Sequence, residues 1–142
     1  MSALSSTAAL PLITTPSIAT APTNGIPHEL AARFADFYGR WREQRGRDEF
    51  ATVEDPELTR WEALNSELAV LQGRIMSCQP QTVDDIVLQA RLCALINSEL
   101  WTDAATVEAA DAGARSHRQL LENIAASSGA ELLPGVETIS LA

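Results

Sequence analysis

The chain has two histidines and two cysteines, side chains that commonly bind metals or take part in catalysis: His28, His117, Cys78 and Cys93. A di-metal site in a helical bundle needs Glu-x-x-His pairs, which bring a carboxylate and an imidazole to one helix face. The residue three positions before His117 is Ala114, and neither histidine has a cysteine or a second histidine at ligand spacing. The sequence therefore predicts no metal site.

The usual patterns of enzymes and nucleotide-binding proteins are absent from the sequence as well. It contains no G-x-S-x-G, no G-x-G-x-x-G and, because it has no lysine, no P-loop. Pairing of His117 with Cys78 or Cys93 in space stays open, although Cys93 lies in the most apolar segment, where burial blunts thiol reactivity. His117 itself fits either a general base or a structural histidine bonded to a carbonyl. We predict a protein that is not an enzyme and holds no cofactor.

The only basic cluster runs over residues 38–47 and combines arginines with aromatic rings. Such side chains are enriched at protein interaction hot spots, and they can also grip single-stranded nucleic acid by charge and stacking. The net charge of the whole chain is −9, which repels phosphates and anionic lipid, so nucleic acid is an unlikely partner and no membrane association is expected. We predict protein contact through four candidate residues: Arg40, Trp41, Arg42 and Arg45.

Apolar residues spaced three and four apart predict four helices. The first extends from His28 to about Arg45 before Gly46, and the second spans 56–78 between Asp55-Pro56 and Pro80. The third begins with a capping box of Thr82 and Asp85 and extends to about Leu100, and the fourth covers about 103–127. The third is apolar nearly all round and is expected to be covered nearly all round.

These helices predict an all-α fold, a three- or four-helix antiparallel bundle or helical hairpin. Residues 28–128 form the helical domain, preceded by a flexible Ser/Thr/Ala/Pro-rich arm at 1–27. Residues 129–142 form a C-terminal tail that is loose or packs as a short extended piece. The core seam is predicted to consist of eight residues: Trp61, Leu64, Leu68, Leu71, Ile75, Ile86, Leu92 and Leu121.

The stretch from Leu68 to Leu95 resembles short helical proteins of unknown function from GC-rich bacteria, often predicted near prophage-like genes. In those proteins a leucine-rich helix ends in a Pro-x-Thr turn and a second helix follows. Four positions match that pattern: Pro80, Thr82, Ile86 and Arg91. Asp85 and Gln89 depart from it, standing where the pattern has a glycine and a lysine. The resemblance covers about a fifth of the chain and implies no activity.

The leading hypothesis is a non-enzymatic helical interaction protein that self-associates, because three apolar seams and one all-apolar helix exceed what a small bundle hides. The first alternative is a regulatory or small-molecule-binding bundle with a pocket beside Trp61, Trp101 or His117. The second is a nucleic-acid-associated regulator using residues 40–47. A cytoplasmic location is expected, because two unpaired cysteines fit a reducing compartment and prolines interrupt the uncharged residues 1–27.

Overall fold

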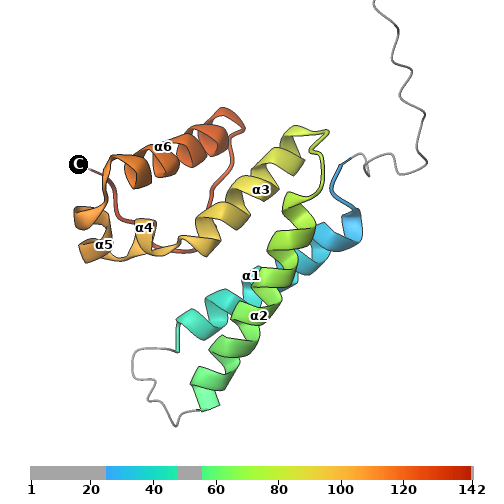
Figure 1. Ribbon diagram of the computed structural model, residues 1–142, viewed down its shortest axis with the longest axis horizontal. Helices are drawn as coiled ribbons and strands as arrows, with labels where there is room; N and C mark the ends of the chain where they lie inside the picture. Colours follow the sequence, from blue (N-terminus) through green and yellow to red (C-terminus); the bar gives the residue numbers. More distant parts are fainter. Residues whose placement is uncertain (1–24, 48–55, 142) are drawn as a thin grey trace, which may run out of the picture.

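The computed structural model describes residues 25–47 and 56–141, and these residues form helices and connecting segments with no β-strand. Helix α1 (His28–Arg45) packs with α2 (Pro56–Met76), and α3 (Val83–Ile96) packs with α6 (Ala112–Ser127) (Figure 1). The short helices α4 (Glu99–Thr102) and α5 (Ala104–Ala109) connect α3 to α6. The predicted all-α fold is confirmed.

The predicted helix boundaries hold where the sequence carries a local signal. Helix α1 follows Pro27 and ends at Gly46. Helix α3 begins with a complete capping box, in which the Asp85 N–H donates to the Thr82 hydroxyl (3.1 Å) and the Thr82 N–H donates to the Asp85 carboxylate (3.2 Å). These bonds satisfy N–H groups that the first helical turn leaves without partners. The predicted cap of α2, Asp55, lies outside the described residues.

The predicted fourth helix is two helices, α5 and α6, and the separate helix α4 precedes them, which corrects the sequence interpretation. Asp103 accepts a hydrogen bond from the Thr106 N–H and caps α5, and Asp111 accepts one from the Ala114 N–H and caps α6, each at 2.8 Å. Asp103 and Ala110 have extended or non-helical backbone angles that end the preceding helix. The spacing of the apolar residues continues across these positions and therefore predicted one helix. It contains no information about a carboxylate that caps a new helix.

The core lies between the two helix pairs and includes most of the predicted seam. Five of its residues are buried: Leu64, Leu71, Ile75, Leu92 and Leu121. Trp61 and Leu68 are half-buried and pack against these residues. Ile86 contradicts the prediction, because 43% of its surface is exposed.

The sequence predicted that helix α3 is covered all round by other parts of the protein. The structure shows that it is not. It packs mainly against α6 and α2, and the flank that carries Ile86 and Ile96 is only partly covered. Val83 is also exposed, in the first turn of the helix. The physical reason is that two neighbouring helices cannot shield the full circumference of a third.

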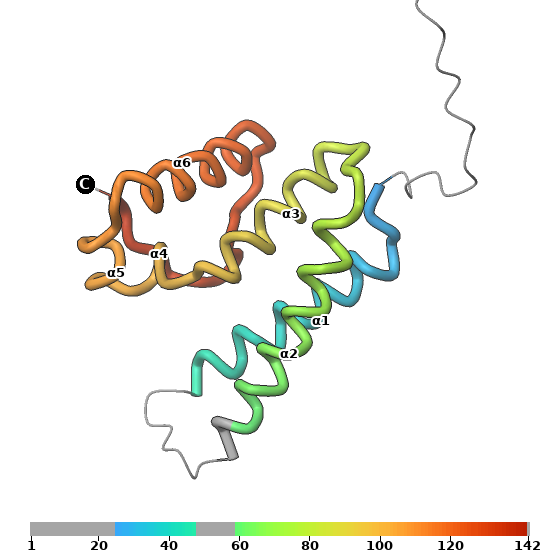
Figure 2. The backbone as a smooth tube through the Cα atoms, viewed as in Figure 1, coloured from blue at the N-terminus to red at the C-terminus, as the bar shows by residue number. Residues whose placement is uncertain are grey.

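Residues 129–141 pack against the helices as an extended segment, which is the second of the two arrangements expected for this tail and not the loose one. Leu132 and Leu133 are buried, with 8% and 5% of their surface exposed. The Ile139 N–H donates to the Trp101 carbonyl at 2.7 Å and brings the segment back beside α4 (Figure 2). The core therefore includes residues on both sides of Gly129, where α6 has ended.

The predicted arm lies outside the described residues as far as residue 24. Gly25 is buried, and its N–H donates to the Gln79 carbonyl at 3.0 Å beside the α2–α3 turn. Within the described ranges, no helix combines the length and apolar character that a bilayer-spanning segment needs.

Candidate functional site

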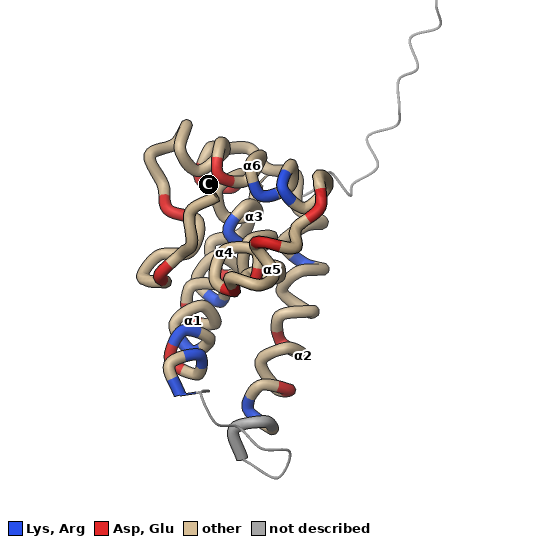
Figure 3. Tube along the Cα trace, turned by 90° about the vertical axis from the view of Figure 1, so that its left-hand side faces the viewer, with Lys and Arg blue, Asp and Glu red and all other residues tan. Residues whose placement is uncertain are grey.

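The basic cluster lies along the C-terminal half of α1 (Figure 3), but its members have different roles. The two Nη atoms of Arg40 donate to the two carboxylate oxygens of Glu67 on α2, each at 2.8 Å, and its Nε donates to Asp36 at 3.0 Å. The bonds with Glu67 raise the pKa of Arg40 above its already high value, and the same pairing lowers the pKa of Glu67. Arg40 thus joins α1 to α2 and has carboxylate partners within its own chain.

Trp41, predicted to be an interaction residue, is a core residue with 6% of its surface exposed. The guanidinium of Arg45 lies over its ring, 5.5 Å from the centroid. This arrangement favours a cation electrostatically and holds the Arg45 side chain against the body of the protein. The sequence predicted both residues to be interaction residues. Of the two, Trp41 is part of the core, and Arg45 is the one whose side chain a ligand can reach.

Arg42 packs against the turn formed by Pro134 and Gly135. Gly135 has a φ of +72°, and a Cβ atom placed on it would clash with Nη2 of Arg42. The adjacent Tyr38 hydroxyl donates to the Pro134 carbonyl at 2.8 Å, and burial raises the pKa of Tyr38 while the charge of Arg42 lowers it. Helix α1 therefore holds the C-terminal segment through one hydrogen bond and one close approach.

Two cavities meet at Arg45. The first, of about 690 Å³, lies between α1 and the C-terminal segment and is lined by Arg42, Arg45, Thr102, Gly135 and Thr138 among others. The second, of about 480 Å³, lies between α1, α2 and the end of α3, and its lining includes Trp41, Arg45, Trp61, Leu68, Leu95 and Ile96. We call the two together the Arg45 cleft. Both volumes fall in the range of small-molecule sites.

The aromatic residues named in the small-molecule hypothesis line separate cavities. Trp61 lines the second cavity of the Arg45 cleft, whereas Trp101 lines a cavity of about 410 Å³ between α6 and residues 130–138. The indole nitrogen of Trp61 and Nε2 of His117 are both shielded from solvent without a hydrogen-bond partner among the described residues. An unpaired buried donor is costly, so the position of Trp61 beside a cavity bears on ligand binding.

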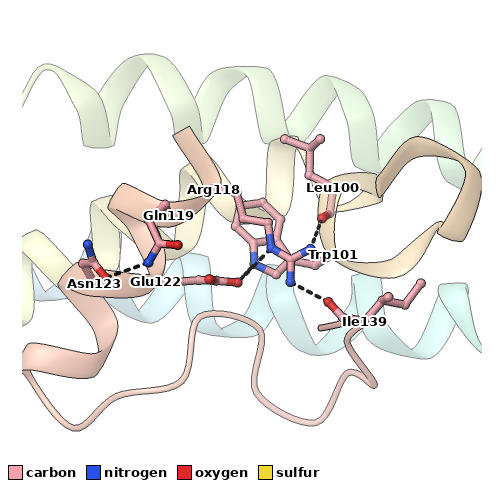
Figure 4. Close-up of polar contacts among 7 residues, drawn as sticks. All are labelled: Leu100, Trp101, Arg118, Gln119, Glu122, Asn123 and Ile139. Atoms are coloured by element: carbon pink, nitrogen blue, oxygen red, sulfur yellow. Dashed lines mark hydrogen bonds and ion pairs between the residues drawn. The ribbon is translucent and has the colours of Figure 1, made fainter. Parts of the chain in front are cut away.

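The sequence analysis missed a buried arginine, Arg118, with 4% of its surface exposed. Its Nε donates to Glu122 at 2.8 Å, Nη1 donates to the Leu100 carbonyl at 2.7 Å and Nη2 donates to the Ile139 carbonyl (Figure 4). Its guanidinium also lies 5.6 Å from the centroid of the Trp101 ring. The i,i+4 spacing of Arg118 and Glu122 was the one signal in the sequence, but such pairs are common on exposed helix faces.

The two cysteines, which the sequence offered as candidate nucleophiles or metal ligands, lie at separate positions in the structure. Cys78 and Cys93 are free thiols, each half-buried, and the Cys78 thiol donates to the Arg74 carbonyl at 3.2 Å. Burial raises the pKa of Cys93, which lowers its reactivity at neutral pH. No group of three or more histidine, cysteine or acidic side chains lies in metal-binding arrangement in the part of the chain that the structure describes.

Comparisons of this chain with protein families, characterised proteins and solved structures find no match.

Proposed function

We propose that this chain is a non-enzymatic helical interaction protein that associates with a second copy of itself through the partly covered flank of α3. Four residues at spacings of three, four and three define this flank, which we call the outer stripe: Ile86, Gln89, Cys93 and Ile96. The observation that carries the proposal is the exposure of its two isoleucines, 43% for Ile86 and 37% for Ile96, on one helix face. Exposed apolar surface at helical spacing is typical of helix–helix interfaces.

The outer stripe contains no charge, although the whole chain has a net charge of −9. Its one polar member, Gln89, uses its amide to donate to the carbonyl of Ile75 on α2 and to that of Cys78 in the turn after α2, each at 3.1 Å. An interface formed by the stripe therefore leaves that amide group bonded and brings no like charges into contact.

A second copy supplies an identical stripe with the same spacing. Across a two-fold axis, each Ile86 and Ile96 can pack between side chains of the opposing α3, in the way that seam residues pack in coiled coils. Two-fold symmetric dimers are the commonest oligomers, and they use one surface on both subunits. A second copy is for these reasons the partner we propose.

The proposal is tested by replacing both exposed isoleucines with glutamate. The double variant Ile86→Glu/Ile96→Glu should be monomeric by light scattering at concentrations where the wild type is dimeric. Val70→Glu is the matched control, because Val70 is 52% exposed on α2 and lies outside the stripe. A wild type that stays monomeric up to high micromolar concentration, or a control that dissociates equally, contradicts the proposal.

Cys93 offers a second and more local test. In a Cys78→Ser background, mild oxidation of the dimer should join two chains through Cys93, because the stripe brings the two thiols near the symmetry axis. The same oxidation of Ile86→Glu/Ile96→Glu should give no covalent dimer. A covalent dimer formed equally by both proteins would show random collision instead.

The proposal includes a cytoplasmic location. Its support is the pair of free thiols, Cys78 and Cys93, which a reducing compartment preserves.

A further inference from the structure

We infer that the Arg45 cleft binds a small organic carboxylate with a flat apolar body, a function separate from the proposed self-association. Arg45 lines both cavities of the cleft, and the two cavities differ in character. The first adds a second arginine, Arg42, and the second adds two tryptophans and aliphatic side chains. A ligand with one anionic end and one apolar end matches this division.

The anionic end is assigned to Arg45 from its surroundings. Its guanidinium is half-buried and stacked over Trp41, and it forms no hydrogen bond or ion pair with another residue of the described ranges. Arg42, three residues earlier on α1, likewise has no carboxylate bound to it in those ranges. A planar guanidinium held in position binds carboxylate by two parallel N–H···O bonds, and less side-chain entropy is lost because the group is already ordered.

The acidic residues of the cleft do not remove this positive character. Glu43 lines the first cavity but is paired with Arg47 at 2.7 Å. Glu99 and Glu137 line the second and first cavities respectively, and both are exposed, so water and salt weaken their effect on Arg45. The half-buried Arg45 keeps a stronger field within the cleft.

The apolar body is assigned to the second cavity. Trp61, Leu68 and Leu95 line it with aromatic and aliphatic surface, and its volume of about 480 Å³ accommodates a fused ring system. The second cavity therefore suits the apolar part of the ligand.

The experiment uses naphthalene-2-carboxylate as the probe and naphthalene-2-methanol as its uncharged analogue, with the full chain. The carboxylate should bind saturably and change tryptophan fluorescence, and the alcohol should bind at least about tenfold more weakly because it lacks the charge-assisted bonds. Arg45→Gln should weaken carboxylate binding by about tenfold and leave alcohol binding unchanged. Arg33→Gln is the matched control, because Arg33 is exposed on the same helix and lines neither cavity.

Three outcomes overturn the inference: no saturable binding of the carboxylate, equal binding of the acid and the alcohol, or equal weakening by Arg33→Gln and Arg45→Gln. The comparison of the two probes needs only the wild type, so it stands even if a variant folds poorly. Light scattering of the same samples keeps this result apart from self-association. Because Ile96 belongs to both the outer stripe and the second cavity, the separate test of dimerisation uses Ile86→Glu alone, at a residue that lines neither cavity. Dimerisation can fail while the carboxylate binds, and carboxylate binding can fail while the protein dimerises.

Discussion

Nη2 of Arg118 on α6 donates a hydrogen bond to the backbone carbonyl of Ile139, 21 residues further along the chain. Nη1 of the same side chain donates to the Leu100 carbonyl, at the start of the connection between the two helices of the second pair. Because the guanidinium is buried and all three of its nitrogen atoms are engaged, one side chain fixes the C-terminal segment and the α3–α6 connection together.

Replacing this arginine should destabilise the protein more than its charge suggests. Arg118→Gln removes the donor of the Leu100 and Ile139 carbonyls and leaves the Glu122 carboxylate with the Trp101 indole N–H, so we expect a loss of about 2–4 kcal/mol in the free energy of unfolding. Urea denaturation followed by circular dichroism measures it. Arg115→Gln removes the same charge from an exposed position on α6 and should cost less than about 0.5 kcal/mol. Equal losses in the two variants would show that the buried network contributes nothing particular.

Alanine substitutions at two glycines, Gly135 and Gly73, are expected to have opposite effects on stability. Gly135→Ala adds a side chain at φ +72° and displaces the Arg42 guanidinium, so it should destabilise by about 1–2 kcal/mol. Gly73→Ala, in the interior of α2 with no atom near the new methyl group, should stabilise by about 0.5–1 kcal/mol. Thermal unfolding of both variants checks the signs. In an Arg42→Ala background the cost of Gly135→Ala should fall, and an unchanged cost would exclude the close approach as its cause.

The pairing of Glu67 with Arg40 predicts a dependence of stability on pH. Because the folded-state pKa of Glu67 lies below its unfolded value, the pair stabilises the protein at neutral pH and loses this contribution as the pH falls through the lowered pKa. Glu67→Gln should therefore be less stable than the wild type at pH 7 by up to about 1 kcal/mol, and the difference should shrink in acid. Urea midpoints from pH 7 to pH 2 measure this. Glu62→Gln, exposed on the same helix, is the control and should show no such convergence.

Burial of Cys93 predicts slow alkylation at neutral pH. Since burial raises its pKa above the ordinary value of 9.0, the rate with iodoacetamide should still be rising beyond pH 9 in a Cys78→Ser variant. The measurement is made at low protein concentration, so that any dimer does not contribute. The same variant in denaturant provides the reference, where the rate should level off near pH 9. Identical profiles in the two conditions would contradict a raised pKa.

The local signals of the sequence were sufficient for the helices they flank. Thr82 and Asp85 form a capping box from side chains only three residues apart, and Gly46 ends α1, so neither feature depends on distant parts of the chain. The spacing of Leu64, Leu71 and Ile75 likewise fixes which face of α2 is buried, because residues three or four apart share a face whatever that face packs against.

The sequence also indicated where charge and aromatic rings gather, but not what each member does. Trp41 and Arg45 lie one turn apart on α1, so their contact follows from the helix itself, whereas only tertiary packing places Glu67 of α2 opposite Arg40. Trp61 joins the cleft from a different helix, and no spacing along the chain relates it to Arg45. A site built across helices is a property of their packing, which short-range patterns do not record.

By itself, then, the sequence determined the all-α class, the capping box of α3 and the buried face of α2, because these follow from bonds and periodicities within a few residues. Only the tertiary structure decided that Arg118 is buried, that residues 129–141 pack, and that one flank of α3 is only partly covered. These outcomes depend on which helices meet and how far they cover one another. A buried arginine and an exposed isoleucine follow from that geometry, because their neighbours are distant in sequence and near only in space.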